Sequence, residues 1–255
     1  MSWLRRSADR AEAVTPPVAP VAPAVRTPRV APLGSPGPRP PDGPAAQLGR
    51  EEHAAPGLRH ALEQLPRPGA SVLDLGPALA ANVAFFEALG ARLRIADLDA
   101  SLEEVELLAA PPATWAARLP ELLPFAEGET FDLVLAWDLP NYLGRERWPA
   151  VARHIIARLA RSGAFHLLVR VGADMPARPC RYRILERGTI SEEPLTATRI
   201  PAPRTPHAEV EKLHPGLVAP RSHLGKHGVQ EYVLEPAAIY DMPPRPIAQP
   251  RKRPR

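Results

Sequence analysis

Four short apolar runs alternate with longer segments of helical spacing, and this alternation constrains the fold more than any other feature of the sequence. The runs lie at 71–75, 93–95, 131–137 and 164–171. Strands that alternate with helices build a parallel sheet with right-handed crossover connections. We therefore expect an α/β fold with a mostly parallel sheet.

The segments around these runs predict the helices. Leucines at helical spacing indicate a helix over 49–65, which stops at the breaker PRPG. Residues 101–110 indicate a second helix, for which Ser101 is a candidate N-cap. The segment 112–130 is irregular, so a third strand there is expected to be short or absent. Residues 145–163 indicate a long helix that ends at the glycine before the fourth run.

The turn after the first run raises the question of a nucleotide site. Asp74 and Gly76 end the strand, but the turn holds one glycine, where a nucleotide-binding turn usually has two or three. Asp97 follows the second run about 20 residues later, at the spacing of an acid that accepts hydrogen bonds from ribose hydroxyls. The alternative is that Asp97 caps the helix that follows it.

Proline is concentrated at the two ends of the chain. It makes up 35 of the 255 residues, and it dominates the segment before residue 46. Residues 1–46 have too little bulky apolar surface to form a core, which is typical of an extended, disordered segment. We expect a folded domain at 47–241 and a disordered basic tail at 242–255.

Charge and cysteine content exclude several classes of protein. The net charge of +4 arises from the two tails, so the folded part is expected to lack a basic face for nucleic acid, and only the C-terminal basic tail is expected to touch phosphates weakly. No apolar segment has the length of a membrane span or a secretion signal. The single Cys180 excludes an internal disulfide. These features indicate a cytoplasmic protein with no membrane partner.

A metal site is not expected either. The four histidines at 207–227 have no cysteine partners and no i, i+4 pair. Zinc sites in proteins usually show such a spacing of ligands.

Taken in chain order, three stretches resemble the class I S-adenosylmethionine-dependent methyltransferases. They are VLDLGPA in the first run, LPFAEGETFDLVLAWDLPNYL at 123–143 and IARLARSGAFHLLV at 156–169. The later segment 207–236 resembles the closing helix and antiparallel strand pair of this family. The resemblance covers residues 50–235. It implies a Rossmann-like three-layer sandwich with an antiparallel C-terminal strand.

The resemblance also implies S-adenosylmethionine as the cofactor. Asp74 and Gly76 match the acidic and first glycine positions of the family's first motif, where backbone amides approach the amino-acid end of the cofactor. Ala78 stands where a further glycine is usual, and its Cβ would cost about 1–2 kcal/mol if the backbone there required a positive φ. The loop from Leu123 to Phe125 is a further implied contact. The cofactor-binding residues that the resemblance implies are Asp74, Gly76, Ala78, Asp97, Leu123 and Phe125.

The turn DLPNYL at 138–143 is the candidate substrate region, because the corresponding turn of the family faces the methyl group. Asp138, Asn141 and Tyr142 are candidates to orient a substrate, and Tyr142 has the alternative role of a packing residue. The turn is similar to the acid-Pro-Pro-Tyr signature of amine methyltransferases, but its spacing differs by one residue and the second proline is missing. No catalytic residue is assigned, and the acceptor, a small molecule or a protein, is not specified.

Two functions from different classes are compatible with these patterns. In the first, the protein is a methyltransferase that binds S-adenosylmethionine. In the second, the fold is retained as a non-catalytic interaction module, and the glycine-poor turn marks a lost site, with the two tails as attachment points. We favour the methyltransferase, because an acid remains at the end of each of the first two strands.

Overall fold

The computed structural model describes most of the expected domain. The described residues are 49–66, 68–101, 110–225 and 228–239. The expected segments 1–46 and 242–255, and most of the expected helix at 101–110, lie outside these residues. The boundaries of the domain at 47–241 therefore stay a prediction.

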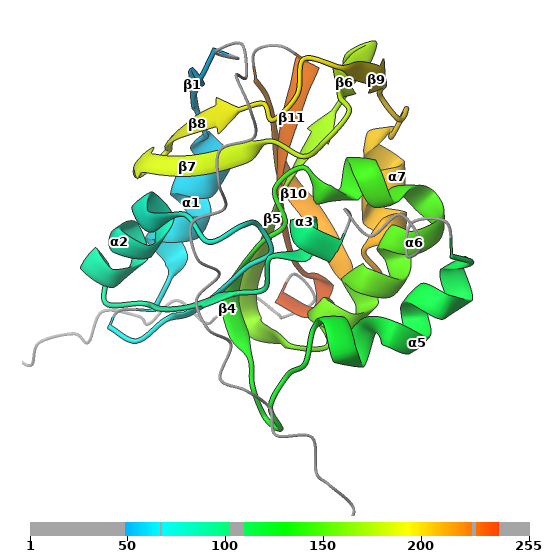
Figure 1. Cartoon of the computed structure of the whole chain (residues 1–255). Helices are drawn as coiled ribbons and strands as arrows, with labels where there is room; N and C mark the ends of the chain where they lie inside the picture. Colours follow the sequence, from blue (N-terminus) through cyan, green and yellow to red (C-terminus); the bar gives the residue numbers. More distant parts are fainter. Residues whose placement is uncertain (1–48, 67, 102–109, 226–227, 240–255) are drawn as a thin grey trace, which may run out of the picture. The chain divides into compact units, whose positions relative to one another are not determined.

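A six-stranded sheet forms the centre of the described part (Figure 1). Its strands, in spatial order, are β10 (Leu217–Leu224), β11 (Val229–Pro236), β5 (Leu159–Arg170), β4 (Phe131–Leu135), β2 (Ser71–Asp74) and β3 (Arg92–Ile95). The four strands from β5 to β3 are parallel, and β11 and β10 complete the sheet as an antiparallel pair. This order confirms the Rossmann-like sheet with an antiparallel C-terminal strand.

Helices cover both faces of this sheet. One face carries α1 (Pro56–Gln64) and α2 (Ala80–Ala88), and the other carries α5 (Pro112–Leu122), α6 (Leu139–Ile156) and α7 (His207–Leu213) (Figure 1). The described part of the chain contains two further short helices, α3 (Leu98–Ser101) and the 3-10 helix η2 (Ala237–Ile239). The layers are those of a three-layer sandwich.

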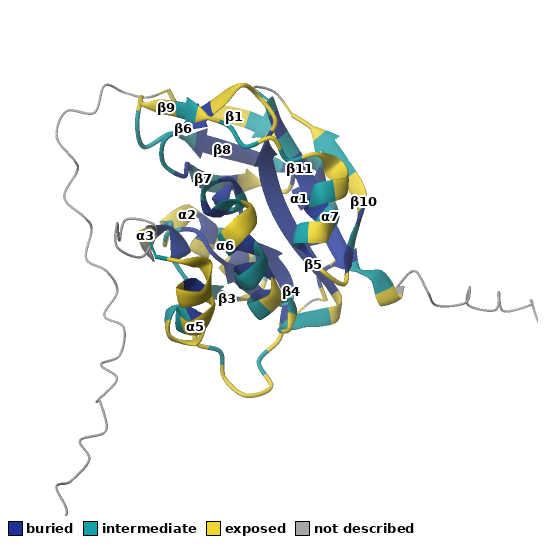
Figure 2. Cartoon of the chain, turned by 90° about the vertical axis from the view of Figure 1, so that its right-hand side faces the viewer, coloured by how far each residue is buried: buried dark blue, intermediate teal, exposed yellow. Residues whose placement is uncertain are grey.

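Side chains that alternate along the strands separate the core into two clusters. In β5, Phe165 and Leu167 belong to the cluster under α5, α6 and α7, while Ala164 and Leu168 belong to the cluster under α1 and α2. Successive side chains of a strand point to opposite faces, so a strand buried on both faces is apolar throughout. Figure 2 shows this burial along β5 and β11.

Two smaller sheets lie beyond the carboxyl ends of β4 and β5. One contains β1 (Glu51–Ala54), β8 (Thr189–Glu193) and β7 (Arg181–Glu186), and the other pairs β6 (Asp174–Pro176) with β9 (Arg199–Pro201). Apart from β1, these strands come from the segment between β5 and α7. No strands were expected in this segment, because it lacks long apolar runs.

Three expected elements differ from the structure. The helix expected over 49–65 begins only at Pro56, because residues 51–54 pair with β8 as an edge strand. The segment 112–130, expected to be irregular, forms α5 with proline in its first turn, where a missing N–H costs no hydrogen bond. The long helix ends at Ile156 rather than at 163, and β5 begins at Leu159.

The described residues 110–130 contain no strand, and they form α5 and a loop before β4. This agrees with the expectation of a short or absent strand. Ser101 is the last residue of α3. The helix that it was expected to cap lies outside the described residues, so Ser101 as its N-cap stays a prediction.

Candidate functional site

The carboxyl ends of β2 and β4 mark the position where an open α/β sheet binds its ligand, and we call this position the crevice. After β2 the chain crosses to β3 on one side, and it then crosses back to β4 on the other side of β2. Ligands of open α/β sheets bind where the strand order reverses in this way. Gly76 follows β2 and Trp137 follows β4, so both lie at this crevice.

Asp74, the last residue of β2, holds the turn together. Its Oδ1 accepts a hydrogen bond from the N–H of Gly76 at 2.9 Å and another from the Nε1–H of Trp137 at 2.6 Å. Its Oδ2 accepts one from Nδ2 of Asn82, in α2, at 3.3 Å. Because both oxygens have partners inside the protein, Asp74 supports the shape of the turn.

The acids that end the two neighbouring strands share one electrostatic environment. Burial raises the pKa of Asp74 to about 6, although the hydrogen bonds that it accepts oppose this rise. The charge of Asp97 raises the pKa of Asp74 further. The structure therefore brings together the two acids that the sequence placed at successive strand ends.

The indole of Trp137 fills the space beside Gly76. A Cβ on Gly76 would lie 3.0 Å from Cδ1 of Trp137, so the ring needs a glycine at this position. Trp137 has a positive φ of 49°. Its ring stacks on that of Tyr182, in β7, with centroids 5.2 Å apart and planes 7° apart. The two rings close one side of the crevice with protein atoms.

Asp97, which follows β3, keeps its carboxylate available. Its φ of 44° lies in the left-handed region, which aspartate tolerates better than most residues. The carbonyl oxygen of Asp97 accepts a hydrogen bond from the N–H of Ala100 at 3.1 Å. The side chain is half-buried, and no hydrogen bond joins its carboxylate to another residue in the described part of the chain. Asp97 thus contacts α3 through its backbone.

Ala78 does not strain the turn. Among the described residues other than glycine, only Asp97 and Trp137 have a positive φ. A backbone with an ordinary φ at Ala78 has no need of glycine there, so the expected cost of its Cβ does not arise. The low glycine content of this turn is therefore no sign in itself of a lost site.

Leu123 and Phe125 lie at the other edge of the sheet. The carbonyl of Leu123 lies 2.9 Å from Nε2 of His154, near the end of α6, and the ring of Phe125 stacks on the same histidine. Phe125 also packs on Phe131, the first residue of β4. Since the crevice lies at the last residues of β4, the structure does not bring this loop to it. We leave Leu123 and Phe125 out of the proposed site.

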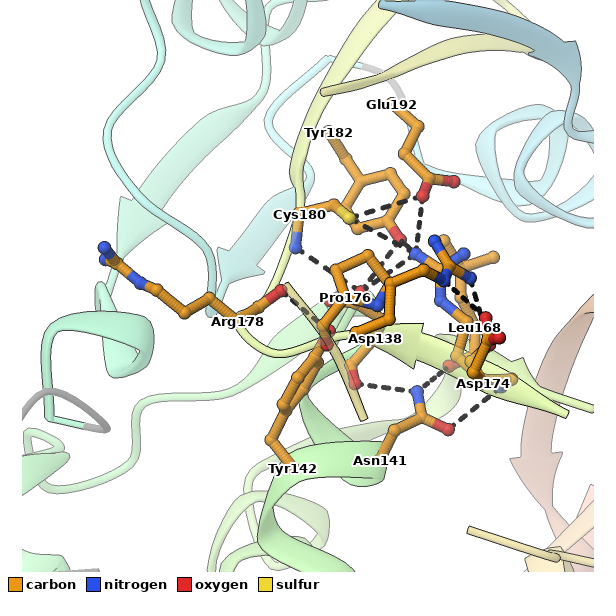
Figure 3. Close-up of polar contacts among 12 residues, drawn as sticks. Asp138, Asn141, Tyr142, Leu168, Asp174, Pro176, Arg178, Cys180, Tyr182 and Glu192 are labelled. Carbon is orange, nitrogen blue, oxygen red and sulfur yellow. Dashed lines mark hydrogen bonds and ion pairs between the residues drawn. The ribbon is translucent and has the colours of Figure 1, made fainter. Parts of the chain in front are cut away.

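Asp138 belongs to a buried network of charged groups (Figure 3). Its Oδ2 accepts a hydrogen bond from the hydroxyl of Tyr182 at 3.0 Å and lies 3.2 Å from Nη2 of Arg170. The same guanidinium nitrogen lies 2.6 Å from Oε1 of Glu192, in β8. The network joins the tips of β4 and β5 to the small sheet above them.

The two carboxyls of this network differ in pKa. Burial raises the pKa of Asp138 to about 6, against the opposing charge of Arg170. Burial also acts on Glu192, but its hydrogen bond with His53 and the charge of Arg170 outweigh it and lower the pKa to about 2. Glu192 is therefore the ionised partner of Arg170 across the whole neutral range.

Asn141 and Tyr142 also bond to the protein itself (Figure 3). Nδ2 of Asn141 donates to the carbonyl of Leu168 at 3.0 Å, and its Oδ1 accepts from the backbone N–H of Arg170. The hydroxyl of Tyr142 donates to the carbonyl of Arg178 at 2.8 Å. These contacts fix the start of α6 against β5 and the chain after β6. A role in orienting a substrate stays a prediction for Asp138, Asn141 and Tyr142.

Sequence reasoning missed Trp137, Arg170, Tyr182 and Glu192. Two of them carried a signal: Trp137 stands directly after an apolar strand, and Arg170 interrupts the apolar run AFHLLVRV at a buried position. An arginine in a buried strand needs a carboxylate partner. Tyr182 and Glu192 lie in the segment without long apolar runs, where no pattern marked them.

Of the comparisons with known proteins, the one with solved structures finds matches. A scan against protein-family models finds no match, and a search of curated protein sequences finds none either. The chain is similar to the PH0226 protein from Pyrococcus horikoshii OT3, with a TM-score of 0.43 and 15% identity over 71% of this chain and 88% of that chain. It is similar to the glycopeptide N-methyltransferase MtfA in complex with S-adenosylmethionine, with a TM-score of 0.38 and 14% identity over 69% and 84%.

A third structure is the 1,6-didemethyltoxoflavin-N1-methyltransferase of Burkholderia thailandensis, with a TM-score of 0.37 and 18% identity over 70% of this chain and 76% of that chain.

The described residues contain no helix that is long and apolar enough to cross a membrane. They also contain no group of three or more histidine, cysteine, aspartate or glutamate side chains placed to hold a metal ion.

Proposed function

We propose that this protein is an S-adenosylmethionine-dependent methyltransferase whose acceptor is not yet identified. The observation that carries the proposal is the available carboxylate of Asp97 beside the Gly76 turn, at the point where the strand order reverses. A nucleoside cofactor needs an acid for its ribose hydroxyls and a tight turn for close approach of the backbone. Both features occur at this crevice.

The residues fit such a cofactor at its ribose end. Asp97 offers a half-buried carboxylate with no bond to another described side chain, and a carboxylate of this kind accepts strong hydrogen bonds from two hydroxyls. Asp74 supports the turn from below, through its hydrogen bond from the N–H of Gly76. The chain would therefore hold the ribose with Asp97 and shape the turn with Asp74.

The fit at the amino-acid end depends on Trp137. The indole lies against Gly76, on the side where the resemblance places the amino-acid end of the cofactor. A ligand with that end therefore binds only if the indole turns away from Asp74. This requirement predicts weak binding to the protein as it stands.

S-adenosylmethionine supplies a methyl group that its sulfonium has already activated. The chain then has to hold the acceptor in line and exclude water. The small sheet of β1, β8 and β7 provides such a cover, because the hydrogen bonds of Arg170 with Asp138 and Tyr182 tie it to the strand tips. This arrangement supports a closed reaction site.

The test is calorimetric titration of the full-length protein with S-adenosylhomocysteine, together with its thermal unfolding. We expect saturable heat and a rise in melting temperature, since a ligand at 100 times its Kd stabilises the folded state by about 2.7 kcal/mol. Absence of binding to both the natural protein and the variant Trp137→Ala would contradict the proposal. That result would favour the non-catalytic interaction module.

A further inference from the structure

We infer that a cavity between the start of α1 and strands β5, β8 and β11 binds an organic amine with an apolar body. The cavity has a volume of about 460 Å³, within the range of pockets that hold small molecules. It lies on the α1 side of the sheet, on the far side of β5 from the crevice at Gly76. No residue of the proposed cofactor site lines it.

The inner wall of this cavity is apolar. Leu168 from β5, Ile190 from β8 and Val229 from β11 line it, and each of these side chains is buried. Leu224, at the end of β10, lies at the rim and is 73% exposed, which is the highest value among the large apolar side chains of the described chain. An apolar ligand body would cover both the wall and this exposed leucine.

The polar part of the cavity is acidic. Among the described residues that line it, Glu52 and Glu231 are the only ones with a fixed charge, and His53 and His223 are the other titratable ones. A low-dielectric pocket with carboxylates attracts a cation more strongly than an exposed surface does. The charge of the lining therefore favours an ammonium group over a carboxylate.

Glu231 has room for one more hydrogen bond. Its Oε1 accepts from the N–H of Leu58 at 2.7 Å and lies 2.8 Å from Nε2 of His166, while among the described residues its Oε2 accepts only from the N–H of Gly57, at 2.8 Å. Two carboxylate oxygens offer about four acceptor positions. The hydrogen bonds with His166 and the start of α1 hold the pKa of Glu231 below its usual range, against the effect of burial. It is therefore an ionised acceptor beside the cavity.

Leu168, which lines the cavity, is a strand neighbour of Trp137. The backbone N–H of Leu168 donates to the carbonyl of Trp137 at 2.7 Å. Glu231 lies on β11, two strands away from β4, which is on the order of 10 Å at the usual spacing of strands. Methylation of a bound amine would rest on the proposed function, whereas the binding of the amine does not depend on that function.

The test compares 2-phenylethylamine with 3-phenylpropionate, which have similar bodies and opposite charges. Calorimetric titration of the full-length protein at neutral pH is expected to show saturable binding of the amine, at least tenfold tighter than that of the acid. Addition of salt to 0.5 M should weaken the binding of the amine less than it weakens a surface ion pair, because the site is partly buried. Equal binding of the two probes, or binding of neither, would overturn the inference.

A pair of matched variants locates the site. Leu224→Arg places a cation at the rim and should weaken amine binding at least fivefold. Leu185→Arg changes another exposed leucine, in β7, and should leave amine binding unchanged. Both positions are exposed, so neither variant depends on repacking of the core. Equal effects of the two substitutions would overturn the inference. Amine binding with no S-adenosylhomocysteine binding to either the natural protein or Trp137→Ala would contradict the proposed function alone, and the reverse result would contradict this inference alone.

Discussion

The indole nitrogen of Trp137 lies 2.6 Å from Oδ1 of Asp74, so a hydrogen bond joins the ends of two neighbouring parallel strands across the crevice. The crevice is where this fold takes its ligand. The same ring lies against Gly76 on one side and stacks on Tyr182 on the other. The proposed cofactor would therefore compete with a side chain of the protein for part of its site.

Removal of this ring should tighten cofactor binding. We expect Trp137→Ala to raise the affinity for S-adenosylhomocysteine at least tenfold in calorimetric titration, because no ring has to be displaced. The same change should lower the free energy of unfolding by about 3–5 kcal/mol, as for other buried aromatic side chains. Trp115→Ala is the control, since this tryptophan is equally buried but belongs to the other core cluster. A gain in affinity with both variants, or with neither, would argue against competition.

Asp97 should contribute to binding and little to stability. We expect Asp97→Asn to reduce the affinity for S-adenosylhomocysteine at least tenfold, because Asp97 would accept from two hydroxyls and hydrogen bonds to a charged acceptor exceed those to a neutral one by roughly 1 kcal/mol each. Asparagine also tolerates the positive φ at this position. Glu87→Gln removes the same charge from an exposed position in α2 and should leave the affinity for S-adenosylhomocysteine unchanged. Unchanged affinity in Asp97→Asn would mean that Asp97 does not hold the ribose.

The sheet could be predicted from the sequence because its strands have a strong local signal. Buried parallel strands are continuous apolar runs, as at 131–135, and such a run has few alternative structures. Residues 51–54 were predicted as helix because EEHA has no strand pattern of its own. Their pairing with β8, more than 130 residues later, decides their structure, and no local pattern reports such a partner.

Half of the candidate site could be predicted for the same reason. Asp74 and Asp97 follow apolar runs directly, so their place at the carboxyl edge follows from the strands themselves. That the indole of Trp137 lies in the crevice could not be predicted. Its position depends on its rotamer and on stacking with Tyr182, which comes from a segment without a clear pattern. Contacts between distant segments fix the positions of both rings.

The buried arginine should be essential to the fold. Arg170→Met leaves the carboxylates of Asp138 and Glu192 without their cation, and loss of one partner from a buried ion pair costs about 3–5 kcal/mol. Urea unfolding should show this loss. Arg199→Met is the matched control, because the pair of Arg199 with Asp174 is exposed on both sides and is worth at most about 1 kcal/mol. Similar losses in the two variants would show that the buried network contributes no more than a surface pair.

His214 should make the protein less stable in mild acid. Burial lowers its pKa to about 4, against the opposing hydrogen bond to Val210, and its Nε2 accepts a hydrogen bond from Trp148 only while unprotonated. Between pH 6.5 and 4 the unfolded chain therefore binds a proton that the folded protein does not, and stability falls by about 1.4 kcal/mol per pH unit. From pH 7 to 5, the natural protein should lose about 2 kcal/mol more than His214→Gln in urea unfolding. A loss in His214→Gln as large as that in the natural protein would assign the proton to another group.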